Sequence, residues 1–142
     1  MRNIREIINN LIDRYGTKDP FILCNNLNIT IMYAELGSIN GYYIQVPKHQ
    51  LIFINKNLNE KRQAFVCAHE LGHAVMHKGL NTFFMQNNTL NIKGKFERQA
   101  NEFASELLID DSLLLEYEGK SLDYISKCEN IELAFLKLKF GK

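Results

Sequence analysis

The chain has 142 residues, which is the length of one ordinary globular domain. Hydrophobic residues make up 46% and charged residues 23%, a composition that excludes a disordered or fibrous protein. Seventeen basic and sixteen acidic residues give a formal net charge of +1, so the chain is not expected to bind nucleic acid directly. No stretch approaches the roughly 18 apolar residues of a membrane span, and the charged first residues predict no secretory signal. We expect a single cytoplasmic domain over residues 1–142 that makes no contact with a membrane.

The three cysteines, Cys24, Cys67 and Cys128, are widely spaced and form no C-x-x-C pair. This pattern does not predict a disulfide framework, and it fits a reducing cytoplasm. We expect each thiol to be buried as a small hydrophobic group.

Two helices are predicted within residues 3–27. Apolar residues recur at helical spacing over residues 4–15, and Gly16 is typical of the residue that ends a helix. Asp19 and Pro20 predict the start of the second helix, because Asp is a favoured capping residue and Pro suits the first helical position.

A sheet is predicted over residues 29–55, where the composition changes to Ile, Tyr, Phe and Val. Short turn-like stretches separate three such runs, so we expect an antiparallel meander of about three strands. The runs are residues 29–36, 42–46 and 51–55.

Helical spacing returns after the sheet, over residues 59–78, with Asn59 as the expected cap. Residues 80–95 are mostly polar and are predicted to form a long loop. A second strong helix is predicted over residues 96–109, and short helices over residues 112–140. The order of helices, small sheet and helices predicts an α+β fold.

The motif with the clearest chemistry is His69-Glu70-Leu71-Gly72-His73, an H-E-x-x-H sequence inside a predicted helix. Histidines four residues apart differ by about 40° in azimuth and 6 Å in rise, so both rings can reach one metal ion. Glu70 lies about 100° from His69 and can approach a water without acting as an equivalent ligand. Two histidine ligands, a polarised water and a carboxylate that takes its proton are the parts of a zinc hydrolase.

The residues around the motif are apolar on every side, which predicts a buried helix. Buried imidazoles and a buried carboxylate need partners, because an unpaired buried charge is costly. The alternative to a metal site is a pair of hydrogen-bonded core histidines beside a glutamate in a salt bridge.

A third protein ligand is expected for a catalytic zinc. His77 lies about 12 Å along the helix axis from His69, too far for three rings to converge, so we expect it beside the ligands or at the helix end. Glu97 is the better candidate because it shares a helix face with small and apolar residues, whereas Glu102 and Glu106 lie about 140° and 180° away.

Asn101 follows Glu97 by one turn on the same predicted face. Its amide oxygen is suited to accept the Nδ1–H of a ligating histidine and so to fix the tautomer of that ring. The alternative is an ordinary side-chain hydrogen bond in the core.

At these residues the sequence resembles the ImmA/IrrE family of zinc metallopeptidases. The resemblance covers roughly residues 30–115 and rests on the strand at residues 51–55, the segment 65–77 with H-E-L-G-H, and the segment 97–108 with E-x-x-A-N-x-F-A. It implies a zincin-like, more narrowly gluzincin-like, core. It also implies His69, His73 and Glu97 as zinc ligands and Glu70 as catalytic base.

The resemblance also implies a substrate, which no spacing in the sequence predicts. Members of this family act as anti-repressors that cut a helix-turn-helix repressor, often encoded beside them in phages and mobile elements. The alternative function is a metal-containing regulatory module that binds and inhibits the repressor without cutting it. Manganese is a possible alternative to zinc, because a His/His/Glu set accepts both.

Two further expectations concern surfaces of the protein. Three lysines near the end of the chain, Lys137, Lys139 and Lys142, raise the possibility of DNA binding, but lysines at a helix end more often serve solubility and the helix dipole. If residues 51–55 are the last strand of the meander, that strand has a free edge on which an extended substrate can pair.

Overall fold

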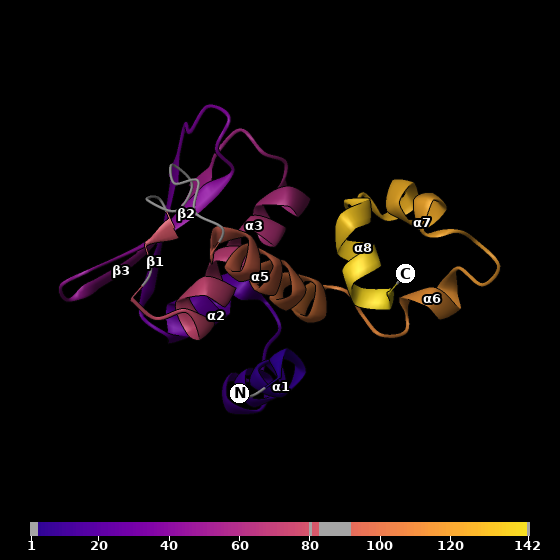
Figure 1. Cartoon of the computed structure of the whole chain (residues 1–142), viewed down its shortest axis with the longest axis horizontal. Helices are drawn as coiled ribbons and strands as arrows, with labels where there is room; N and C mark the ends of the chain where they lie inside the picture. Colours follow the sequence, from indigo (N-terminus) through magenta and orange to yellow (C-terminus); the bar gives the residue numbers. More distant parts are fainter. Residues whose placement is uncertain (1–2, 80, 83–91, 142) are drawn as a thin grey trace.

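The computed structural model describes residues 3–79, 81–82 and 92–141, which form an α+β fold as predicted (Figure 1). None of the helices in these ranges is long and apolar enough to cross a membrane. In chain order the elements are α1 (Ile4–Tyr15), α2 (Pro20–Asn26), β1 (Ile29–Ala34), β2 (Gly41–Val46), β3 (His49–Asn55), α3 (Glu60–Met76), α5 (Ile92–Leu108), α6 (Leu113–Glu116), α7 (Leu122–Glu129) and α8 (Leu133–Phe140).

The helix starts follow the predicted capping chemistry. The Asp19 side chain accepts a hydrogen bond from a backbone N–H in the first turn of α2, and Pro20 occupies the first helical position. Asn59 caps α3 in the same way, and Gly16 ends α1 with a φ of 71°. Two helix boundaries differ from prediction by two residues or more, since α3 ends at Met76 and α5 begins at Ile92, inside the stretch expected to be a loop. The rest of that predicted loop, apart from residues 81–82, lies outside the described residues.

The sheet is mixed, and the predicted antiparallel meander is wrong. The strand order is β1-β3-β2, with β1 parallel to β3 and β2 antiparallel to β3. Ile52 and Ile54 of β3, the central strand, are fully buried. The two-residue turn between β2 and β3 fixes that pair as a hairpin, whereas the longer connection over residues 35–40 lets β2 lie one strand away from β1.

The central position of β3 also overturns the expectation that a substrate pairs along residues 51–55. Both edges of β3 are already hydrogen-bonded, one to β1 and the other to β2. A peptide cannot add to a strand that has no free edge.

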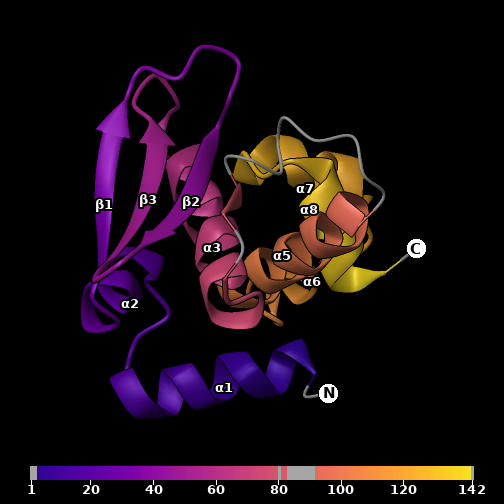
Figure 2. The ribbon, with the colours of Figure 1, turned by 60° about the vertical axis from the view of Figure 1, so that its left-hand side comes forward.

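Helix α3 lies between the sheet and α5, so it is enclosed on both sides (Figure 2). On the α5 side the two backbones approach closely, because a Cβ atom at Gly72 would lie only 3.0 Å from the Phe103 ring. Ala100 and Ala104, predicted to allow this approach, are fully buried. Helices α1 and α8 pack on the outer side of α5. The side chains between α3 and α5 are therefore largely buried, among them His73 and Phe103.

The cysteines are free thiols, as expected. Cys24 on α2 and Cys67 on α3 are fully buried, and their sulfur atoms lie 3.8 Å apart. Cys128 is exposed, so the expectation of burial is wrong for this residue. It lies near the end of the short helix α7, in which Ile125 is the buried residue.

Candidate metal centre

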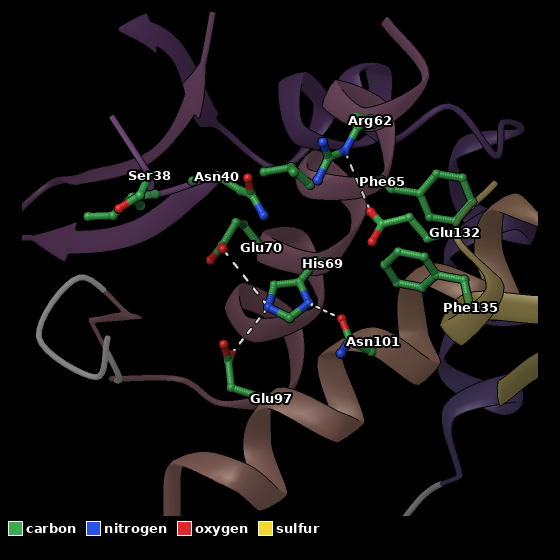
Figure 3. A pocket seen from close by; sticks show the side chains of 13 residues that line it. Ser38, Asn40, Arg62, Phe65, His69, Glu70, Glu97, Asn101, Glu132 and Phe135 are labelled. Atoms are coloured by element: carbon green, nitrogen blue, oxygen red, sulfur yellow. Dashed lines mark hydrogen bonds and ion pairs between the residues drawn. The ribbon is translucent and has the colours of Figure 1, made fainter. Parts of the chain in front are cut away.

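Three side chains from α3 and α5 converge at one point, and Figure 3 shows two of them, His69 and Glu97. The Oε1 atom of Glu97 lies 3.2 Å from Nε2 of His69 and 2.5 Å from Nε2 of His73. The three candidate ligand atoms all lie within 4.8 Å of one another. The structure therefore brings together the two histidines and the downstream carboxylate that the sequence singled out.

The other two acids of α5 lie away from this point. Glu106 forms ion pairs with Arg5 on α1 at 3.0 Å and with Lys139 on α8 at 2.9 Å. Glu102 and Glu106 are half-buried rather than fully solvated, because α1 and α8 cover this side of α5. Helical phase thus separates Glu97 from its neighbours, although it overestimates how exposed those neighbours are.

The charges of the cluster depend on one another. Burial alone would raise the pKa of Glu97, but the hydrogen bonds and charges of His69 and His73 outweigh it and hold that pKa well below its usual range. Burial alone would lower the pKa of His69, but the hydrogen bond to Glu97 and the charges of Glu70 and Glu97 raise it above the ordinary value. An ionised carboxylate between two imidazoles is an environment that stabilises positive charge at the point where the three side chains meet.

Asn101 determines which nitrogen of His69 faces the cluster. Its Oδ1 atom lies 2.7 Å from Nδ1 of His69. An amide oxygen can only accept, so Nδ1 carries a hydrogen and Nε2 is left for a bond toward Glu97. Asn101 therefore has the contact predicted from its position one turn after Glu97.

His73 is held by a longer chain of contacts. Its Nδ1 atom lies 3.0 Å from Nδ1 of His77, and Nε2 of His77 lies 2.7 Å from Oε1 of Gln99. Burial lowers the pKa of His77 and so favours its neutral ring. If Gln99 accepts a hydrogen bond from Nε2–H of His77, Nδ1 of the neutral His77 ring carries no hydrogen and accepts one from Nδ1–H of His73. Nε2 of His73 then carries no hydrogen and faces the cluster. His77 thus lies beside the candidate ligands, as predicted.

The sequence pattern does not predict that Gln99 lies near the site. Counted from Glu97, an ideal helix places it about 200° round α5, on the side opposite the candidate ligand. It is linked to the cluster through His77, the C-terminal cap of α3, which in turn contacts His73.

Glu70 is the second carboxylate of the site and is only 3% exposed. Burial raises its pKa above the ordinary value, against the lowering effect of His69 and His73. Its Oε2 atom lies 4.0 Å from Nε2 of His69, while its Oε1 atom accepts a hydrogen bond from Thr82 at 3.0 Å. Thr82 was also missed, because it lies in the stretch predicted to be a loop, where no periodic pattern distinguishes one polar residue.

His69 and Glu97 line a cleft of about 360 Å³ together with Glu70 and Asn101, whereas His73 is fully buried behind it (Figure 3). One end of the cleft is lined by residues 38–41, between β1 and β2. At the other end, the rings of Phe65 and Phe135 lie 4.6 Å apart between centroids, and Arg62 lies 3.6 Å from Glu132. Helix α8 therefore contributes side chains to the same cleft as the metal-binding candidates.

Comparison with known proteins points to a peptidase family. The family described as the IrrE N-terminal-like domain, a peptidase family, matches residues 24–141, a range that includes every residue of the cluster. A peptidase with two histidines and a carboxylate converging in its cleft is a metallopeptidase, and imidazole and carboxylate together suit a divalent metal ion as its cofactor. The chain belongs to the IrrE N-terminal-like family.

Three curated relatives illustrate the range of this family. The Uncharacterized immunity region protein 2 of Bacillus phage phi105 is 39% identical over 139 residues, which cover 94% of this chain and 88% of the relative. Metallopeptidase ImmA of Bacillus subtilis (strain 168) is 37% identical over 135 residues, covering 94% of this chain and 76% of the relative. Radiation response metalloprotease IrrE of Deinococcus deserti is 35% identical over 60 residues, covering 42% of this chain and 21% of the relative.

Proposed function

We propose that this metallopeptidase is a zinc-dependent endopeptidase of the cytoplasm that cleaves a helix-turn-helix transcriptional repressor and so acts as an anti-repressor. The observation that carries the proposal is the convergence of His69, His73 and Glu97 beside the buried carboxylate of Glu70, at a cleft that His69, Glu70 and Glu97 line. The names of two relatives, an immunity region protein of a phage and the metallopeptidase ImmA, support a role in the control of a mobile element.

In this proposal His69, His73 and Glu97 hold the metal, and Asn101 and His77 orient the two histidines. The fit to a metal rests on donor chemistry, since two Nε2 atoms face one carboxylate oxygen. Zinc in this position would supply Lewis-acid polarisation of the scissile carbonyl and of the attacking water. Manganese suits the same three donors and is the alternative ion.

Glu70 is the proposed general base. Its Oε2 atom is the oxygen nearer the cluster, so it is placed to take a proton from the attacking water and to return it to the leaving amine. Its burial keeps bulk water away from the carboxylate and raises its basicity.

The cleft also indicates how a peptide is selected. Phe135, half-buried and packed against the buried ring of Phe65, offers an apolar surface for one substrate side chain, and the residues 38–41 form the opposite end. Specificity for one protein substrate then requires that its cleaved segment place a large apolar side chain beside the scissile bond.

The test uses the zinc-loaded protein and the helix-turn-helix repressor encoded nearest to it. The wild-type protein is expected to cut the repressor once, and Glu70→Gln to retain the metal while losing at least about 100-fold in cleavage rate. If Glu70→Gln cleaves at a rate near that of the wild type, the assignment of the base is wrong. If it relieves repression in cells without cleaving, the protein is a regulatory module that binds the repressor.

A further inference from the structure

We propose that Thr82 is a positioning residue that fixes the orientation of Glu70 and ties it to the edge of strand β2. This inference rests on the proposed function, because it takes Glu70 to be the catalytic base. It concerns a residue outside the H-E-x-x-H helix and outside the helix that supplies Glu97.

The contacts of the Thr82 hydroxyl define what it can do. The residue is only 2% exposed, and its Oγ1 atom accepts a hydrogen bond from the backbone N–H of Tyr43 at 2.5 Å. The one hydroxyl hydrogen then has two acceptors in reach, Oε1 of Glu70 at 3.0 Å and the Tyr43 carbonyl at 3.4 Å. The carboxylate is the closer and, when ionised, the stronger acceptor, so the hydrogen points to Glu70.

This bond distinguishes the two oxygens of Glu70. With Oε1 held by Thr82, Oε2 is the oxygen that faces the cluster, 4.0 Å from Nε2 of His69. Within the described residues, Thr82 is the donor that hydrogen-bonds this buried carboxylate. Without the hydroxyl, the carboxylate loses that donor and is free to rotate about its last torsion angle.

The neighbouring residue explains how Thr82 is held in place. The Oδ1 atom of Asn81 accepts a hydrogen bond from the backbone N–H of Gln45 at 2.7 Å. Tyr43 and Gln45 alternate along β2, so their N–H groups both point away from β3. Asn81 and Thr82 therefore bind two consecutive outward N–H groups of one strand, but only Thr82 reaches the base.

This arrangement provides a matched pair of variants. Thr82→Val removes the hydroxyl and keeps the β-branched shape, so it breaks both the contact with Glu70 and one contact with β2. Asn81→Ala breaks one contact with β2 and leaves Glu70 untouched. Thr82→Ser restores a hydroxyl at the same position.

We expect Thr82→Val to lower kcat about 10- to 100-fold with little change in KM or in bound zinc. Thr82→Ser should recover most of the loss, and Asn81→Ala should keep kcat near that of the wild type. An equal loss of kcat in Thr82→Val and Asn81→Ala would mean that the two residues only attach their segment to β2. Wild-type kcat in Thr82→Val would also overturn the proposal.

A spectroscopic measurement separates this inference from the proposed substrate. Loss of the hydroxyl should shift a carboxyl band in the infrared difference spectrum of Thr82→Val against wild type, and the shift should vanish when both proteins also carry Glu70→Gln. An absent shift would refute the contact whatever the activity. Kinetics on unfolded casein extend the test, because a wild-type protein that cuts casein but not the repressor contradicts only the proposed substrate.

Discussion

Replacing Asn101 with leucine removes the amide oxygen 2.7 Å from Nδ1 of His69 while nearly conserving side-chain volume. The His69 side chain is only 14% exposed, so its Nδ1–H would have little access to water as a substitute acceptor. The neutral ring would then be free to place its hydrogen on Nε2, the atom 3.2 Å from Glu97. A ring in that tautomer cannot bind a metal through Nε2.

The expected effect of Asn101→Leu is a 10- to 100-fold rise in the zinc dissociation constant, because contacts behind a metal ligand typically contribute that much. This corresponds to about 1.4–2.8 kcal/mol of binding free energy. Competition with a chromogenic chelator at fixed pH measures the constant. Asn101→Asp is the matched control, since it retains an acceptor oxygen and should bind zinc at least as tightly as the wild type. A dissociation constant for Asn101→Leu within about threefold of the wild type, in a protein with unchanged thermal stability, would refute the orienting role.

Three other expectations follow from the same geometry. Glu97→Ala should abolish stoichiometric zinc binding in a metal analysis of the purified protein, whereas Glu102→Ala should not; equal loss in both would contradict the choice of ligand. Gly41→Ala should lower the free energy of unfolding in urea by about 1–3 kcal/mol, because a Cβ there would lie 2.6 Å from a β3 carbonyl oxygen and 2.6 Å from a valine methyl of α3. Gly94→Ala, in an open position on α5, should instead raise the free energy of unfolding by up to about 1 kcal/mol. If both substitutions changed this free energy in the same direction, our interpretation of the packing would be wrong. Phe135→Ala should raise KM for a cleaved peptide about threefold to tenfold at unchanged zinc content, and an unchanged KM would remove α8 from the substrate site.

The candidate metal site was the most predictable part of the molecule, because it depends on helical geometry within short segments. His69 and His73 share a face of α3 as their spacing requires, and Glu97 is the acid of α5 that points to them. The same reasoning could not find Gln99 or Thr82. Helical phase places Gln99 away from Glu97, and it reaches the site only through His77 at the end of α3, whereas Thr82 lies in a connection that has no period to follow.

The order of the strands was less predictable for a different reason. Alternation and turn residues located β1, β2 and β3, but they describe each strand separately. Which strand becomes central depends on how much apolar surface each can bury against α2 and α3, a property of the assembled protein. The turn at Pro47 and Lys48 fixed only one of the two pairings, and the parallel pair of β1 with β3 joins residues about twenty positions apart.

The distribution of the thiols gives the protein a natural reporter of local unfolding. Cys128 is open to solvent, whereas Cys24 and Cys67 face each other in the interface between α2 and α3. An alkylating reagent should therefore modify one group rapidly and the other two only when these helices separate. The rate of the slow modification, compared with that of unfolded chain, measures the free energy of that separation. Since α3 carries His69 and His73, the same measurement with and without zinc would report how far metal binding holds the helix in place.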